Sequence, residues 1–135
     1  MTRANKTRGE SGIVLDGVSY VLRPSFEALE AIEDETGKGL GRLLAEATRG
    51  DLTVKATATV ITECIRAQGR ATGDDGMAKV NTDKIGKLMM TMDGGYVAAL
   101  GIIIDLISTA LTGGYSVEGE VVAPTGTAKK APAGA

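Results

Sequence analysis

The longest apolar run of the sequence lies between Tyr96 and Thr112, and it limits what the chain can fold into. A helix over this run would be about 25 Å long, which is shorter than the roughly 30 Å hydrocarbon core of a bilayer. Asp105 stands in its middle, where lipid would make a charged side chain costly. We therefore expect a helix that is covered by protein, and we expect no membrane partner.

This run also predicts a surface for another protein. At about 100° per residue its apolar side chains occupy more than half of the helix circumference, and Asp105, Ser108 and Thr109 lie on the remaining arc. The chain has 135 residues, enough for one domain. We expect this helix to be central in the fold, and any apolar face that the small domain leaves uncovered to bind a partner.

A β-hairpin is predicted near the start of the chain, over residues 11–23. Asp16 and Gly17 form a strong two-residue turn signal between two short apolar runs, and such a turn pairs Leu15 with Val18. Because alternate residues share a face, one side of the hairpin should pack on helices. That side comprises Ile13, Leu15, Val18, Tyr20 and Leu22. The strand edges would stay available for a further strand.

Five helices are predicted after the hairpin, so the fold class is α+β and mainly α. Helical spacing of apolar residues, capping residues and glycines indicates their positions. Ser25 should cap the first helix, with Phe26 on its inner stripe, and Gly69 should end the third helix. The helices span about 25–36, 39–49, 53–68, 82–93 and 96–112, within one domain over 10–114.

Flexible termini are predicted on both sides of this domain. Residues 1–9 are polar and basic, and residues 115–135 are rich in Ala, Gly, Thr and Pro. Neither segment carries enough apolar side chains to offset the entropy of ordering.

The composition argues against an enzyme. The sequence has no histidine, the side chain that most often transfers protons near neutral pH and most often binds metals. A single cysteine, Cys64, forms no intrachain disulfide and no cysteine-based zinc site, and we expect it in the core. We therefore expect no catalytic residue, no metal site and no cofactor, in a cytoplasmic protein.

Two acidic segments raise the alternative of metal binding or acid–base chemistry. The first is the run from Glu27 to Glu35, for which a solvated helix face is the simpler interpretation. The second is Asp74 and Asp75 between glycines, which lacks the alternating ligands and closing glutamate of a calcium loop. We interpret it as a mobile surface loop.

Nucleic acid is not an expected partner, since the net charge is −2 and provides no basic field. A small nucleic-acid-associated regulatory module that uses Arg3, Lys6 and Arg8 remains an alternative.

Methionines and aliphatic residues of the last two helices are the candidates for a protein-binding surface. Flexible methionine side chains suit an adaptable interface. The candidate residues are Met89, Met92, Leu100, Ile104, Ile107 and Leu111.

Residues 15–44 show a resemblance to a known family. The matching features are the hairpin Leu-Asp-Gly…Tyr-Val-Leu, the helix start Arg-Pro-Ser-Phe-Glu-Ala-Leu and the helix end Ile-Glu…Thr-Gly. This stretch resembles the small protein encoded between the tail tube and tape-measure genes of gene transfer agents and related siphophages. That family is described either as a gene transfer agent tail protein or as a tail assembly chaperone.

The resemblance implies a phage or prophage tail morphogenesis factor without catalysis. Its partners would be the tape measure protein and the tail tube protein, in the cytoplasm of the bacterial host. The alternative is a structural virion component, such as a tail tube or connector subunit, which would be found in the particle. A homo-oligomer stays open.

Overall fold

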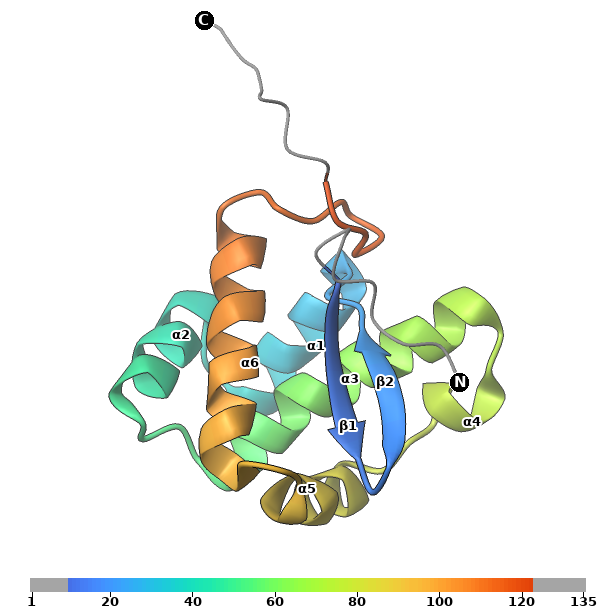
Figure 1. Cartoon of the computed structure of the whole chain (residues 1–135). Coiled ribbons are helices and arrows are strands. Elements are labelled where there is room, and N and C mark those ends of the chain that lie inside the picture. Colours follow the sequence, from blue (N-terminus) through green and yellow to red (C-terminus); the bar gives the residue numbers. More distant parts are fainter. Residues whose placement is uncertain (1–9, 123–135) are drawn as a thin grey trace, which may run out of the picture.

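The computed structural model describes residues 10–122, and it has an α+β fold that is mainly helical, as predicted (Figure 1). The predictions for residues 1–9 and 123–135 lie outside the described residues. The strands and helices are β1 (Ser11–Leu15), β2 (Val18–Leu22), α1 (Phe26–Thr36), α2 (Leu40–Arg49), α3 (Val54–Thr72), α4 (Asp75–Ala78), α5 (Thr82–Thr91) and α6 (Gly95–Leu111).

The hairpin has the predicted turn and register. Asp16 and Gly17 both have positive φ, as this turn requires, and Leu15 pairs with Val18. Ile13 and Leu15 are buried on the predicted side. Val21 belongs to the opposite side of the hairpin by alternation, and it is also buried and lines a cavity together with Tyr115. The C-terminal residues described below therefore reach the second face of the hairpin.

Helix α1 begins and ends where the sequence predicts, but its inner face differs. The Ser25 side chain accepts a hydrogen bond from the Ala28 N–H, and Gly37 ends the helix in the left-handed conformation. Ala28 and Ile32, one turn apart, are fully buried. Phe26 was expected beside them but is 58% exposed. Phe26 is the first residue of α1 and follows the hairpin closely, and at this position its side chain lies outside the inner face that Ala28 and Ile32 form.

The central helix is α3, and the prediction that α6 is central was wrong. Thirteen residues of α3 are buried, against five of α6. Helix α3 contacts α1, α4, α5, α6 and β2, and Figure 1 shows it crossing behind the hairpin. Its many threonines are accommodated because hydroxyls such as those of Thr57 and Thr59 donate to carbonyls one turn earlier. Cys64 lies in this core, as predicted.

Helix α3 runs past Gly69, which was expected to end it, and stops at Gly73. Gly69 serves close packing instead. A Cβ atom on Gly69 would lie 2.3 Å from the backbone nitrogen of Ala78, in α4. The region around Asp74 and Asp75 was predicted to be a mobile loop, but it contains the short helix α4. The Asp74 side chain caps this helix by accepting a hydrogen bond from the Met77 N–H at 3.0 Å.

Residues 115–122 form a turn that packs on the start of α1, and we call them the C-terminal turn. A β-bridge joins Tyr115 to Val121. The Phe26 N–H donates to the Val117 carbonyl at 2.8 Å, and Arg23 donates to the Glu118 carbonyl at 3.2 Å. The tail was predicted to be flexible, whereas its residues 115–122 make these contacts with the start of α1. Backbone hydrogen bonds to a distant segment hold them in place, and composition does not reveal such bonds.

No single helix among residues 10–122 combines the length and apolar character of a membrane span. Helices α5 and α6 reach the required length and apolar character only when the two are counted as one segment, and the chain bends by 115° between them.

Candidate protein-binding surface

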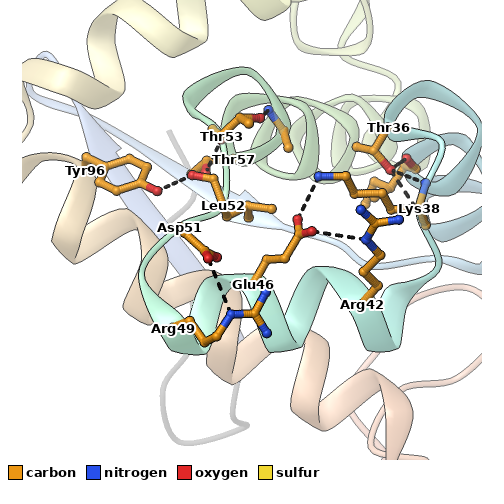
Figure 2. Close-up of polar contacts among 12 residues, drawn as sticks. Thr36, Lys38, Arg42, Glu46, Arg49, Asp51, Leu52, Thr53, Thr57 and Tyr96 are labelled. Atoms are coloured by element: carbon orange, nitrogen blue, oxygen red, sulfur yellow. Dashed lines mark hydrogen bonds and ion pairs between the residues drawn. The ribbon is translucent and has the colours of Figure 1, made fainter.

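The start of α6 is fixed to the junction between α2 and α3. Gly94, with φ of 82°, turns the chain into the helix. The Tyr96 hydroxyl then donates a hydrogen bond to the Leu52 carbonyl, and Thr53 next to it caps α3 (Figure 2). This bond gives α6 a defined position although its N-cap has no capping side chain.

An ion-pair cluster holds α2, the helix on which α6 packs, to the preceding loop (Figure 2). Glu46 is mostly buried and contacts Lys38 at 2.7 Å and Arg42 at 3.1 Å. The hydrogen bond from Lys38 lowers the pKa of Glu46, and the Arg42 guanidinium lowers it further. The cluster therefore favours the ionised form of Glu46 and ties α2 to the loop before it.

One face of α6 remains open, and we call it the α6 outer stripe. Its members recur every three or four residues: Val97, Gly101, Ile104, Ser108 and Leu111. Val97 is 75% exposed and Leu111 is 48% exposed. The Ser108 hydroxyl donates to the Ile104 carbonyl, so its polar group is satisfied within the helix. The stripe thus presents the aliphatic side chains of Val97 and Leu111 to solvent, and the exposed Asp105 lies at its edge.

Three of the six predicted binding residues lie in the core. Met89 and Ile107 are fully buried, and Leu100 is 6% exposed, so they offer a partner no surface. They belong to the face of α5 or α6 that packs inward, which helical spacing alone does not distinguish from an outward face. A binding role for these residues would require the core to open.

The other three predicted residues are placed differently. Ile104 and Met92 are partly buried against the core, and Leu111 is exposed. Their role in binding stays a prediction. Asp16 and Gly17 are exposed at the tip of the hairpin, and no third strand pairs with the hairpin within the described part of the chain.

Sequence analysis did not identify a groove of about 650 Å³ between α3 and α5, which we call the α3–α5 groove. Val54 and Met90 contribute apolar surface and are 44% and 47% exposed. Gly86 lies close to the Ala58 side chain, 3.3 Å from where a Cβ would be, so small residues let the helices approach. A glycine inside a predicted amphipathic helix was the one signal available. The groove is lined by Val54, Lys55, Ala58, Arg66, Asn81, Thr82, Asp83, Gly86, Lys87 and Met90.

Some of the acidic residues of α1 have hydrogen-bond or ion-pair partners within the fold. Glu27 pairs with Arg70 at 2.8 Å, and Glu33 accepts a hydrogen bond from the Leu40 N–H at 3.0 Å. Over residues 10–122, acidic and cysteine side chains form no group of three or more arranged to hold a metal ion.

Glu35 hydrogen-bonds with Glu63, a buried carboxyl group on α3 that Arg66 contacts at 2.8 Å. Its hydrogen bond to Glu63, together with burial and the charge of that group, raises the pKa of Glu35 to about 7. Two carboxyl groups that share a site favour one proton between them.

Cys64 is a free thiol that is fully buried in the core. Burial raises the pKa of its thiol to about 12, and the nearby Glu63 charge acts in the same direction. The thiolate is therefore disfavoured at neutral pH, which suits a core side chain.

Comparison with known proteins places the chain in a family. No curated protein and no solved structure matches it. A family model described as phage tail tube protein, GTA-gp10, matches residues 8–113, from before β1 to just beyond α6. The resemblance drawn from residues 15–44 is thereby confirmed at the level of a phage or gene transfer agent tail protein. The chain belongs to the phage tail tube protein family GTA-gp10.

Proposed function

We propose that this protein is a non-catalytic tail assembly chaperone that holds the tape measure and tail tube proteins before they assemble. The observation that carries the proposal is the α6 outer stripe, a helix face on which the aliphatic side chains of Val97 and Leu111 are 75% and 48% exposed. An exposed apolar face of this kind is a binding site or an aggregation risk. In a tail protein family, another tail protein is the natural occupant.

The surroundings of α6 support a binding role. The Tyr96 hydrogen bond and the Glu46 cluster hold the helix and its support in place without covering the outer stripe. A preordered face loses little conformational entropy when a partner binds. The apolar face of a partner helix, such as one from a long helical tape measure, would fit such a stripe. The proposed setting is the cytoplasm of the bacterial host.

Co-expression with a fragment of the tape measure protein tests the proposal. We expect the wild-type protein to raise the soluble fraction of the fragment, and the double variant Val97→Glu, Leu111→Glu to lose this effect. Val14→Glu is the matched control, because Val14 is 54% exposed but lies on the hairpin. A fragment that is equally insoluble with and without the wild-type protein would refute the chaperone function.

A structural role in the virion is the second candidate, and the description of the family as a tail tube protein favours it. Mass spectrometry of purified particles separates the two. A stoichiometric amount in mature particles supports the structural role, whereas absence from particles supports the chaperone.

A further inference from the structure

We propose that the protein self-associates head to tail, with the exposed face of α1 from one copy seated in the α3–α5 groove of the next. This inference concerns surfaces other than the α6 outer stripe, and no α6 residue lines either of them. It can therefore hold or fail independently of the proposed function.

The first surface is a stripe on α1 that ends in an aromatic ring. Phe26, Glu30 and Asp34 are spaced four residues apart, so they lie on one side of the helix, and all three are exposed. Helix α1 carries five acidic residues and no basic residue. Within residues 10–122, neither Glu30 nor Asp34 has an ion-pair partner.

Phe26 extends the apolar end of this stripe onto the C-terminal turn. It is the only phenylalanine of the chain, and it is 58% exposed. Val117, whose carbonyl accepts the Phe26 N–H, is 69% exposed beside it. The folded chain therefore holds two apolar side chains on the surface next to an acidic helix.

The second surface, the α3–α5 groove, has the complementary character. Val54 and Met90 supply exposed apolar surface, and the cations Lys55, Arg66 and Lys87 outnumber the single anion, Asp83. Lys87 contacts Asp83 at 3.1 Å in an exposed ion pair, since both side chains are more than three-quarters exposed, and water screens such a pair. Arg66 is engaged with Glu63, and Lys55 has no ion pair within residues 10–122, so Lys55 is directly available to a partner, and Lys87 becomes available by exchanging the exposed Asp83 for a partner carboxylate.

The apolar and charged groups are also separated by similar distances along the two helices. Phe26 and Glu30 are separated by about 6 Å along α1, and Met90 and Lys87 by about 4.5 Å along α5. An aromatic ring in the groove beside Met90 would therefore bring Glu30 within reach of the Lys87 ammonium, whose side chain is long and mobile. Each contact joins an apolar group to an apolar group, and a carboxylate to an ammonium.

The occupant is a second copy of this chain because the two complementary surfaces lie on one molecule but far apart. Helix α5 lies beside the hairpin turn, whereas α1 begins after the opposite end of the hairpin (Figure 1). Two different surfaces that contact each other form a heterologous interface, which closes into a ring or continues as a filament.

A charge exchange tests this interface. One variant carries Glu30→Lys and Asp34→Lys, and the other carries Lys55→Glu and Lys87→Glu. All four side chains are exposed, and circular dichroism of each variant verifies folding. In either variant alone, the two surfaces have the same charge. In an equimolar mixture, each surface of one variant faces an oppositely charged surface of the other.

Sedimentation analysis of the wild-type protein at about 0.01 M salt should show mass above the 13.8 kDa monomer, and the excess mass should be lost at about 1 M salt. Each variant should remain monomeric at low salt, and the mixture should regain association. A monomeric wild-type protein, association that persists in either variant, or a mixture that stays monomeric would each overturn the proposal.

Discussion

At the scale of single residues, glycines show what the sequence could and could not reveal. Gly17 was correctly predicted in the hairpin turn, and Gly37 directly follows the predicted end of the first helix at residue 36, because each meets a local need for positive φ. Gly69 was interpreted in the same way but lies inside α3, where the missing side chain admits the backbone of α4. That requirement comes from a neighbour in space, so local sequence patterns do not reveal it.

Replacing Gly69 with alanine should destabilise the protein by roughly 3 kcal/mol, because the new Cβ would overlap the backbone of α4. Gly101→Ala is the matched control. Gly101 is also inside a helix, but a Cβ there meets no atom within 4 Å, so this change should stabilise by about 1 kcal/mol. Urea unfolding measures both values. Equal effects of the two substitutions would contradict the packing role of Gly69.

The Glu35–Glu63 pair should make stability depend on pH. The folded-state pKa of Glu35 is raised from 4.5 to about 7, so the folded protein binds more protons than the unfolded chain between these values. The contribution of Glu35 to the free energy of unfolding is therefore fully present below pH 4.5 and is lost as the pH rises through about 7. Glu35→Gln should remove this decline and gain stability relative to wild type at the higher pH.

Urea unfolding of both proteins across this pH range is the measurement. Glu30→Gln, which removes an exposed carboxyl from the same helix, is the control. A pH dependence that changes equally in the two variants would show that the effect does not arise from the contact with Glu63.

At the scale of elements, type and order were predictable, but their burial was not. The hairpin and five of the helices follow from turn residues, caps and periodicity, with ends displaced by a few residues. Apolar periodicity marked α6 as the central helix, yet α3 is the more buried of the two. Alanines and threonines let the other elements approach α3 closely, whereas α6 packs at one side and keeps an exposed stripe.

The same limit applies to the candidate site. Met89, Leu100 and Ile107 are apolar and correctly spaced, but they face inward. Val97 is apolar like these residues, but it lies on the side of α6 that no other element of residues 10–122 covers. The C-terminal turn was missed because its contacts to Arg23 and Phe26 are made by backbone carbonyls, which every residue has.

The C-terminal turn should depend on Gly119. Its φ is 85°, and a Cβ there would lie 2.6 Å from the Ser25 backbone nitrogen. Gly119→Ala should therefore displace the turn, break the Phe26–Val117 hydrogen bond and cost roughly 3 kcal/mol. Gly113→Ala, also at positive φ but with open space around it, should cost only about 1 kcal/mol. Thermal or urea unfolding of both variants compares them, and equal losses would contradict a packed turn.

At the scale of the whole molecule, we assign the binding of other tail proteins and the association of copies of the chain to different surfaces. The α6 outer stripe would bind other tail proteins, and the α1 stripe and the α3–α5 groove would join copies of the chain. The core between them contains the buried Cys64. The family match was predictable from residues 15–44, whereas the division of the surface required the arrangement of α1, α5 and α6 in space.

The central claim is that the α6 outer stripe touches the partner, and site-specific photocrosslinking tests it most directly. Cys64, the single cysteine, is buried, so an introduced cysteine would be the reactive thiol to which a photocrosslinker attaches. Probes are attached at Val97→Cys and, as the control, at Val14→Cys, and each protein is irradiated with the co-expressed tape measure fragment. We expect a covalent adduct from position 97 and little from position 14. An adduct from position 14 alone, or from neither position, would contradict binding through the α6 outer stripe.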